Sequence, residues 1–470
     1  MRKTQVAVLG AGPGGYAAAF RAADLGQQVV LVDPEENPGG VCLHRGCIPS
    51  KALLHVARLL FEAREAEAWG VRFGPPQIDV DRLRAWKDRV VARLTGGLGQ
   101  LARARTVDLL RGTASLADAR TLRVATPGGG EEMVEFEHCI LASGSRPVSL
   151  PGLEAGHEAV WDSTAALALP AVPGSLLVVG GGYIGLELGT VYASLGARVC
   201  VVEMTAGLIP PADRDLVKPV QARLEGLFEA IMLQTRVTHV EGADGGLRVR
   251  LEPAHGQPFE KTYERVLVAV GRRPNSEGMG LENTRVQLDE RGFVLVDDQL
   301  RTAEPTLFAI GDLTGAGLAH TATHQGQLAA EVIAGQRATF GPNAIPAVVF
   351  TDPELAWCGL TESEARAQGR PHQVARFPWS ASGRATTLGR SDGLTKLLVD
   401  PESERILGVG VVGPGAGELI AEGVLAMEMA TRVGDLRLTI HPHPTLSETL
   451  MEAAEVFCGQ SAHHHAPRRG

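Results

Sequence analysis

Two cysteines separated by four residues are the most reactive feature of this 470-residue sequence. Residues 42–51 read Cys42-Leu-His-Arg-Gly-Cys47-Ile-Pro-Ser-Lys51. Such a pair can form a disulfide where the chain bends, and a helix N-terminus or a nearby cation such as Lys51 lowers the pKa of a thiol. A zinc site is the main alternative, but no second cysteine pair accompanies this one. We therefore predict a redox-active dithiol at Cys42 and Cys47.

A histidine-rich segment near the C-terminus could supply the base that thiol exchange needs. Residues 441–448 read His-Pro-His-Pro-Thr-Leu-Ser-Glu. A histidine, with an ordinary pKa of about 6.5, can accept a proton from a thiol, and a carboxylate on its other nitrogen orients it. The same residues also fit a proline-rich turn in which Thr445 and Glu448 form a helix capping box. The two interpretations are compatible.

A strand–glycine turn–helix–strand pattern occurs twice, and an acid follows the second strand in both copies. The first copy predicts strands at 5–9 and 29–32 around a helix at 16–25, with the key residues Gly10, Gly12, Gly15 and Asp33. The second predicts strands at 176–179 and 199–202 around a helix ending at 195, with Gly180, Gly182, Gly185 and Glu203. The same number of residues separates the first glycine from the acid in each copy.

This pattern is typical of dinucleotide binding. The first glycine makes a tight turn, the second lets the backbone approach the pyrophosphate, and the third lets helix and strand pack closely. The acid accepts hydrogen bonds from ribose hydroxyls. One copy alone could be an ordinary glycine turn, but two copies with matched acids predict two dinucleotide sites and electron or hydride transfer between two cofactors.

Further segments outline the domains. Residues 140–147 and 266–275 look alike and predict two crossings between a first nucleotide domain and an inserted second one. Residues 302–312 predict a strand that ends in Asp312, at the strand edge where cofactors bind in open α/β sheets. Predicted strands at 347–350, 394–399 and 408–412 and a helix at 417–429 indicate an α+β third domain. Residues 461–470 are polar and predict a loose tail.

Composition excludes several classes of protein. Apolar residues make up 44% and charged residues 21%, as in soluble globular proteins. The net charge of -9 argues against nucleic-acid binding. No apolar run approaches the roughly 20 residues of a membrane helix. Six cysteines are too few for a disulfide scaffold, and the N-terminus lacks a signal-peptide pattern, which favours the reducing cytoplasm.

The sequence resembles the pyridine nucleotide–disulfide oxidoreductases over nearly its whole length, most specifically in residues 40–51, 309–312 and 441–448. The resemblance implies an α/β fold with two Rossmann-like dinucleotide-binding domains and a C-terminal α+β dimerisation domain. The expected division is an FAD-binding domain at 1–148 and 273–343, an NAD-binding domain at 149–272, a dimerisation domain at 344–460 and the tail at 461–470.

The resemblance also assigns roles to residues. Cys42 is implied to exchange with substrate and Cys47 to face the flavin, while His443, oriented by Glu448, is the base and reaches the dithiol of the other subunit. A homodimer is therefore expected. The residues implied to hold FAD are Gly10, Gly12, Gly15, Asp33, Lys51, Gly112, Asp312 and Ala319. Those implied on the NAD side are Gly180, Gly182, Tyr183, Ile184, Gly185, Glu203, Val237 and Gly271. Glu187 is implied to pair with Lys51 near the flavin.

Within the family, the motifs favour a dihydrolipoyl substrate on the lipoyl domains of a 2-oxoacid dehydrogenase complex or a related carrier. Glu203 favours NAD over NADP, because a carboxylate would face the 2′-phosphate and no arginine follows it in residues 204–207. The alternatives are an NADPH-dependent disulfide reductase, a mercuric reductase, for which Cys458 lacks a neighbouring cysteine, and a catalytically silent flavoprotein scaffold.

Four positions depart from the family pattern. His44 and Arg45 replace an asparagine and a small apolar residue and could add charge beside the thiols. Pro442 replaces the more usual alanine, and Asp33 replaces the commoner glutamate, which shortens its reach to a ribose by one methylene. These departures remove no reacting group.

Overall fold

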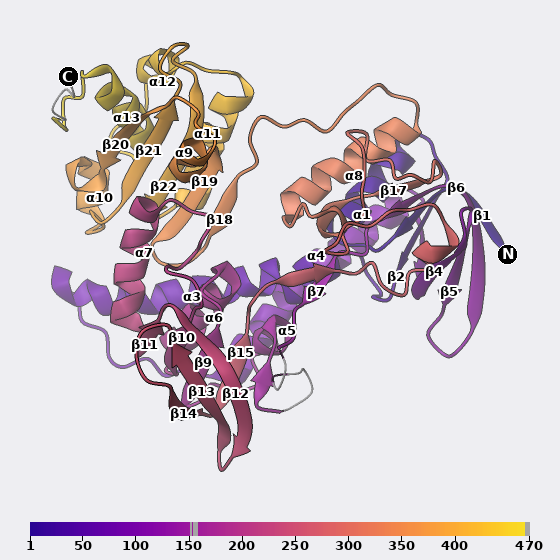
Figure 1. Ribbon diagram of the computed structural model, residues 1–470, viewed down its shortest axis with the longest axis horizontal. Coiled ribbons are helices and arrows are strands. Elements are labelled where there is room, and N and C mark those ends of the chain that lie inside the picture. Colours follow the sequence, from indigo (N-terminus) through magenta and orange to yellow (C-terminus); the bar gives the residue numbers. More distant parts are fainter. Residues whose placement is uncertain (151–152, 154–157, 466–470) are drawn as a thin grey trace.

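The computed structural model describes residues 1–150, 153 and 158–465 in three domains (Figure 1). Residues 151–152, 154–157 and 466–470 lie outside the description, so the second half of the predicted tail is among them. In the first half of the tail, Ser461 Oγ and His463 Nδ1 contact the carboxylate of Glu452 at 3.0 and 2.5 Å.

The first nucleotide domain is built on a seven-stranded sheet of order β3-β2-β1-β6-β5-β4, in which β17 also pairs with β6. Its central strands are parallel and almost fully buried, which explains their continuous apolar sequences. The strands are β1 (Arg2–Leu9), β2 (Val29–Asp33), β3 (Asp108–Arg111), β4 (Thr113–Asp118), β5 (Thr121–Ala125), β6 (Glu131–Leu141) and β17 (Leu307–Ala309).

Five α-helices of the described residues belong to the same domain. Helices α1 (Pro13–Asp24) and α8 (Ala319–Ile333) pack against each other beside the sheet (Figure 1). Helices α2 (Gly40–Arg45), α3 (Cys47–Glu65) and α4 (Val80–Ala104) follow β2. Because α3 contacts α6 (Tyr183–Ser194) of the second domain, it links the two nucleotide domains.

The second nucleotide domain has a parallel five-stranded sheet of order β11-β10-β9-β15-β8 and a separate antiparallel sheet of order β12-β13-β14. Its first elements are β8 (Val160–Trp161), α5 (Ser163–Ala168), β9 (Ser175–Val179), α6 (Tyr183–Ser194), β10 (Arg198–Val202) and α7 (Arg214–Leu227). The remaining strands are β11 (Ala230–Met232), β12 (Thr235–Ala243), β13 (Gly246–Pro253), β14 (Phe259–Tyr263) and β15 (Arg265–Val268).

Two short strands join the nucleotide domains. Strands β7 (Ser145–Pro147) and β16 (Arg272–Pro274) pair antiparallel, so the chain leaves the first domain and returns to it side by side. This confirms the two crossings predicted from the similar segments at 140–147 and 266–275.

The C-terminal domain is an antiparallel sheet of order β18-β19-β22-β21-β20 with helices around it, which confirms the α+β prediction. Its strands are β18 (Ala347–Val349), β19 (Glu354–Gly359), β20 (Gln373–Pro378), β21 (Leu394–Val399) and β22 (Ile406–Gly413). Its helices are α9 (Glu362–Ala367), α10 (Gly383–Thr387), α11 (Ala416–Glu428), α12 (Val433–Leu438) and α13 (Glu448–Cys458). Within the described residues, no helix is long and apolar enough to cross a membrane.

Two local predictions were wrong. The strand predicted at 302–312 is confined to β17, because Leu307 N–H donates to the Glu304 carbonyl and closes a turn before the strand begins. The predicted capping box is only half formed. Helix α13 begins at Glu448, whose carboxylate accepts the Thr445 N–H at 2.7 Å, but the Thr445 hydroxyl donates to the Pro442 carbonyl instead of capping the helix.

Candidate active site

The first glycine turn, between β1 and α1, has the geometry that its sequence predicts. Gly10 has φ of 99°, and an added Cβ would lie 2.4 Å from the Ala142 carbonyl oxygen. A Cβ on Gly15 would lie 1.8 Å from the Gly10 oxygen, so α1 can approach β1 only without a side chain there. A Cβ on Gly12 would meet no atom within 4 Å, which leaves room for a pyrophosphate to approach the backbone.

Asp33 ends β2 and closes this turn. Its carboxylate accepts the Ala11 N–H at 2.6 Å and the Glu35 N–H at 2.9 Å. Burial raises the pKa of Asp33 despite these two hydrogen bonds. The turn opens into a cavity of about 520 Å³, within the range of about 300–1,000 Å³ that is usual for ligand sites. Other predicted FAD residues that line this first cavity are Lys51, Gly112, Asp312 and Ala319.

Both cysteines line the same cavity. Cys42 lies in α2 and Cys47 begins α3, and both are free thiols in this structure. A Cβ on Gly46 would lie 2.8 Å from the Val41 carbonyl oxygen, so the glycine permits the tight turn that returns the chain to Cys42. A Cβ on Gly40 would lie 2.5 Å from Gly12 Cα, which places the start of α2 directly on the glycine turn.

The two thiols are electrostatically different. The hydrogen bond between the two sulfurs lowers the pKa of Cys47 to about 7 and raises that of Cys42. Burial opposes the ionisation of Cys47, whereas the positive charge of Lys51 favours it. These effects favour ionisation of Cys47 over ionisation of Cys42.

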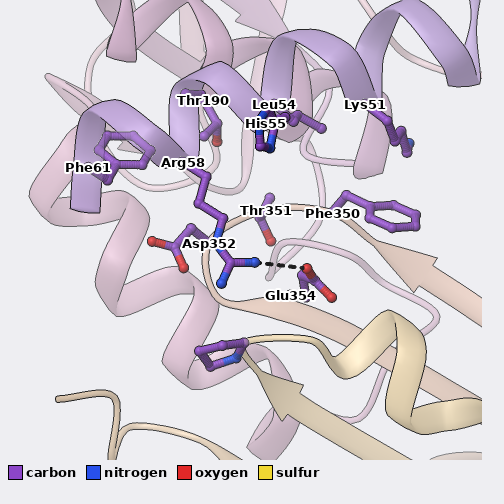
Figure 2. A pocket seen from close by; sticks show the side chains of 12 residues that line it. Lys51, Leu54, His55, Arg58, Phe61, Thr190, Phe350, Thr351, Asp352 and Glu354 are labelled. Atoms are coloured by element: carbon purple, nitrogen blue, oxygen red, sulfur yellow. Dashed lines mark ion pairs between the residues drawn. The ribbon is translucent and has the colours of Figure 1, made fainter. Parts of the chain in front are cut away.

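Lys51 connects the cysteine helix to both other domains. Its Nζ lies 2.8 Å from Glu187 Oε2 of α6, which confirms the predicted ion pair. The same Nζ lies 4.4 Å from the ring centroid of Phe350, and Figure 2 shows the Lys51 and Phe350 side chains. The second oxygen of Glu187 accepts the Phe350 N–H at 3.0 Å. Glu187 is 3% exposed, and a buried carboxylate needs such partners to compensate for the water it has lost.

The two histidines of the C-terminal segment have different surroundings. His441 bonds through Nδ1 to the Thr439 carbonyl and through Nε2 to Glu422, and its side chain is 6% exposed. His443 Nδ1 lies 2.9 Å from Glu448 Oε1, while 73% of the side chain is exposed. The geometry of His443 is therefore that of an oriented, accessible imidazole, and that of His441 is structural.

Glu448 is held in its charged form. Burial opposes ionisation, but the Thr445 N–H and His443 outweigh it and lower the pKa of the carboxyl group. His443 is not among the described residues that line the first cavity, so one chain does not bring it to the thiols.

The second glycine turn reproduces the first. Gly180 has φ of 112°, a Cβ on Gly185 would lie 2.3 Å from the Gly180 oxygen, and a Cβ on Gly182 would meet nothing within 4 Å. The carboxylate of Glu203 accepts the Gly181 and Thr205 N–H groups, each at 2.7 Å.

A second cavity, of about 620 Å³, opens at this turn. The predicted residues that line it are Gly180, Gly182, Tyr183, Ile184, Glu203, Val237 and Gly271. Gly185 does not line the second cavity but lets α6 approach the turn at Gly180. Glu187 lines the first cavity.

The two cavities meet at shared lining residues, which are Ser145, Tyr183, Ile184, Arg272, Asp312 and Gly317. Tyr183 is 42% exposed at this junction. Arg272 donates to Ser145 Oγ at 2.7 Å, and Ser145 donates to Asp312 at 2.5 Å. Groups bound in the two cavities can therefore approach each other here.

Sequence reasoning missed two neighbours of the site. Tyr16 of α1 lies near the dithiol, and burial together with the two cysteines raises its pKa. Arg236 lines the second cavity but pairs with Glu252 at 3.1 Å. Tyr16 could have been found from its position next to the first glycine turn. Arg236 could not, because it is remote from Glu203 in sequence and belongs to no motif.

The side chains of His44 and Arg45 are held by the segment that follows Asp33, although Arg45 also lines the first cavity with both cysteines. His44 Nε2 lies 3.1 Å from the Asn37 carbonyl oxygen, and Arg45 pairs with Glu35 at 2.5 Å. Both side chains contact the segment that follows Asp33, and Glu35 balances the charge of Arg45. The zinc alternative gains no support, since the described part of the chain contains no group of three or more side chains suited to a metal ion.

Comparison with known proteins agrees with this geometry. Residues 4–326 match the pyridine nucleotide-disulphide oxidoreductase family, and residues 345–454 match its dimerisation domain. The chain belongs to this family. The dihydrolipoyl dehydrogenase of Vibrio cholerae is 48% identical over 458 residues, which cover 97% of this chain and 96% of the relative. That of Haemophilus influenzae is 49% identical, covering 97% and 95%.

A solved structure has the same overall fold. The HOCl-induced flavoprotein disulfide reductase RclA of Escherichia coli, as a Cu(II) complex, superposes with a TM-score of 0.85 at 28% identity, covering 97% of this chain and 99% of RclA. The α/β fold prediction is confirmed. The protein is an FAD-dependent disulfide oxidoreductase that uses FAD and NAD, and its dimerisation domain supports the predicted homodimer.

Proposed function

We propose that the protein oxidises dihydrolipoyl groups through the Cys42–Cys47 disulfide and reduces NAD⁺. The observation that carries the proposal is the pair itself. Two thiols whose pKa values are shifted in opposite directions line the same cavity as the glycine turn and Asp33. Relatives at 48–49% identity over nearly the full length are dihydrolipoyl dehydrogenases, which supports the choice of substrate.

The thiol exchange can be derived from the properties of the two cysteines. One thiolate of the dihydrolipoyl group attacks Cys42 Sγ, the S–S bond breaks, and Cys47 leaves as the thiolate, which its lower pKa favours. The second dihydrolipoyl thiolate attacks the sulfur bonded to Cys42, so lipoyl disulfide forms and Cys42 takes a proton. The pair gains two electrons and the dihydrolipoyl group loses two.

The base is assigned to His443 of a second subunit. Glu448 holds its Nδ1, which leaves the other ring nitrogen for the proton released by the substrate thiol. Because His443 does not line the first cavity of its own chain, the proposal requires a homodimer in which each chain completes the site of the other.

The first cavity fits FAD, since Gly12 faces open space and Asp33 offers carboxylate oxygens for a ribose. Bound FAD supplies two-electron transfer between the dithiol and the nicotinamide. Lys51 places a positive charge beside Cys47, and Glu187 forms an ion pair with it. Tyr183 covers the junction between the cavities.

The second cavity fits NAD better than NADP. Both oxygens of Glu203 are held by backbone N–H groups, so the carboxylate is fixed where a ribose hydroxyl would donate to it. A 2′-phosphate would bring about −1.5 to −2 charges against it. The lipoyl domains of a 2-oxoacid dehydrogenase complex, or a related lipoyl carrier, are the proposed partners, and the reducing cytoplasm is the proposed compartment.

Steady-state assays test this function. Purified protein is given dihydrolipoamide, glutathione disulfide or Hg(II), each with the NAD and the NADP nucleotides. We expect turnover with dihydrolipoamide and NAD⁺ far above every other combination. Comparable turnover with glutathione disulfide and NADPH, or with Hg(II), would contradict the proposal.

Replacement of His443 by Gln tests the base. We expect dihydrolipoamide turnover to fall by a factor of about 10²–10⁴, because general-base catalysis typically contributes that much. The matched control is His441→Gln, which changes the structural histidine of the same segment. Flavin content and melting temperature verify folding, and unchanged turnover in the folded His443→Gln protein would show that the base lies elsewhere.

A further inference from the structure

The loop that joins β10 to α7, residues 204–212, forms one wall of the second cavity. Met204, Thr205 and Pro210 line the cavity directly after Glu203. Because an acid in this position bonds the ribose of the adenosine half of a dinucleotide, the loop lies on the adenosine side. The role of this loop therefore rests on the proposed binding of NAD in the second cavity.

The loop is strained where it touches the glycine turn. Ile209 N–H donates to the Gly181 carbonyl at 3.0 Å, so the loop packs on the turn that approaches the pyrophosphate. Ile209 has φ of 48°, a left-handed conformation that a β-branched residue adopts only at a cost. Such a conformation persists only where the surrounding structure enforces it.

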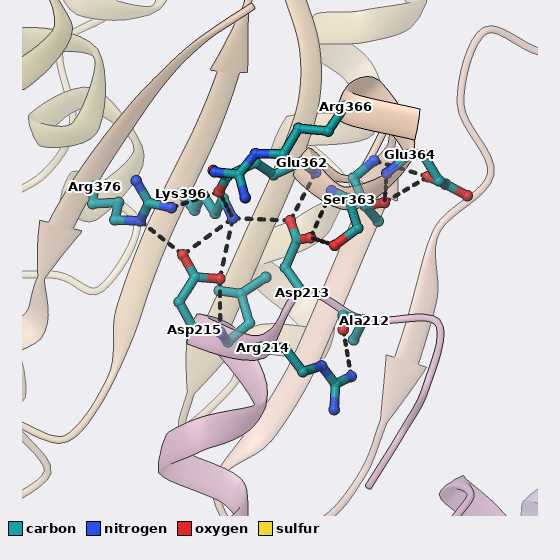
Figure 3. Close-up of polar contacts among 12 residues, drawn as sticks. Ala212, Asp213, Arg214, Asp215, Glu362, Ser363, Glu364, Arg366, Arg376 and Lys396 are labelled. Atoms are coloured by element: carbon teal, nitrogen blue, oxygen red, sulfur yellow. Dashed lines mark hydrogen bonds and ion pairs between the residues drawn. The ribbon is translucent and has the colours of Figure 1, made fainter. Parts of the chain in front are cut away.

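Arg214, the first residue of α7, supplies that enforcement. Its guanidinium donates to the carbonyl oxygens of Leu208, Ile209 and Ala212 at 2.7, 2.6 and 2.5 Å (Figure 3 shows the bond to Ala212). A Cβ on Gly207 would lie 2.6 Å from Arg214 Nη1, so the glycine makes room for the guanidinium. One exposed arginine therefore holds three carbonyls of the loop in a single arrangement.

The end of the loop is fixed from the C-terminal domain. Asp213 accepts Lys396 Nζ of β21 at 2.9 Å, and it also accepts the Glu362 N–H at 2.9 Å and the Ser363 N–H at 3.1 Å from the start of α9 (Figure 3). Burial opposes the charge of Asp213, but Lys396 and the backbone N–H groups outweigh it and lower its pKa.

The surrounding charges balance around Lys396, which is 1% exposed. Its Nζ also pairs with Asp215 at 3.1 Å and with Glu362 at 2.7 Å, and Arg376 pairs with the same two carboxylates at 2.7 and 2.5 Å. Arg366 adds a third cation against Glu362. Because a buried charge that loses its partner is costly, this cluster holds the two domains together at the base of the loop.

We propose that Arg214 and Lys396 are positioning residues for NAD. Arg214 holds the adenosine-side wall of the cavity in its strained shape, and Lys396 anchors the end of that wall from the C-terminal domain. Nucleotide affinity then depends on residues that do not line the cavity and that lie partly outside the nucleotide-binding unit.

Arg214→Met tests the proposal in the FAD-loaded enzyme. We expect the Kd for NAD⁺ and for ADP-ribose, measured by calorimetric titration, to rise about tenfold, which corresponds to about 1.4 kcal/mol. KM for NAD⁺ should rise in parallel while kcat at saturating NAD⁺ and flavin content stay unchanged. Arg198→Met is the matched control, since Arg198 is also an exposed arginine that donates to a backbone carbonyl of the same domain.

Two further variants change the partners of the same loop rather than Arg214 itself. Gly207→Ala should displace the guanidinium and weaken ADP-ribose binding in the same direction, with less risk to folding than a core change. Lys396→Met changes the anchor in the C-terminal domain and should also weaken the binding of ADP-ribose. Wild-type affinity for ADP-ribose in Arg214→Met and in Gly207→Ala would overturn the proposal, whereas a wild-type protein that binds no NAD⁺ would instead overturn the proposed function.

Discussion

The two glycine-turn units share their local hydrogen bonds but differ in the segments that come after the acid. In each, the acid accepts the N–H of the residue after the first glycine, Ala11 or Gly181, and the N–H two residues after itself, Glu35 or Thr205. After Asp33 the chain enters the two helices that carry the cysteines. After Glu203 it enters the loop held by Arg214.

This difference separates binding from chemistry. Matching local sequence produces matching nucleotide sites, but the reactive sulfurs are attached to the first site alone. The cavities meet only at a few residues, such as Tyr183 and Asp312. The first unit therefore combines a cofactor site with a reactive group, whereas the second unit provides a nucleotide site alone.

Removal of a sulfur that distinguishes the first unit should abolish most of the activity. Cys42→Ser should lower dihydrolipoamide turnover by about 10³-fold or more, because no disulfide can form. Oxidation of NADH by ferricyanide should remain, since it requires the two nucleotide sites and not the thiols. Cys458→Ser is the control outside the site, and substantial lipoamide turnover in Cys42→Ser would contradict the assignment.

Matched substitutions in the two turns should have different consequences of intermediate size. Gly12→Val and Gly182→Val each place a side chain in open space facing a cavity, so the fold should tolerate both. We expect Gly12→Val to be purified with little flavin. Gly182→Val should keep its flavin but raise KM for NAD⁺ by about 10–100-fold, because the side chain blocks the pyrophosphate.

Flavin absorbance relative to protein, and NAD⁺ titration, measure the two effects. If Gly182→Val also loses flavin, or if Gly12→Val keeps it while losing NAD⁺ affinity, the assignment of the two cavities is wrong.

A change of the charge beside the thiols should shift a titration rather than abolish activity. Cys47, with its pKa lowered to about 7, is neutral below that pH and a thiolate above it, so thiolate absorbance of the reduced protein should rise through pH 7. Lys51→Met removes a favourable positive charge and should move this midpoint upward by about one pH unit. Ultraviolet titration measures the midpoint, Lys218→Met is the exposed control, and an unchanged midpoint in Lys51→Met would exclude this role of Lys51.

The local elements could be predicted from the sequence because their signals are local. A strand predicted at 394–399 is β21 (Leu394–Val399), and both glycine turns have the predicted shape because close backbone approaches require glycine at fixed spacings. The predicted capping box is only half formed. The Thr445 hydroxyl can donate to the nearby Pro442 carbonyl instead of capping the helix, and the sequence does not show which hydrogen bond forms. Arg214 was missed because nothing around it forms a motif.

The two nucleotide units, their acids and the cysteine pair could be recognised in the amino-acid sequence, because backbone sterics and short-range hydrogen bonds act between residues close in the chain. Folding leaves His443 accessible and buries the His441 side chain, places Phe350 beside the expected Lys51–Glu187 pair, and brings Lys396 to Asp213. These contacts join residues far apart in sequence. Their energies depend on burial and on charge partners, and both exist only once the domains have packed.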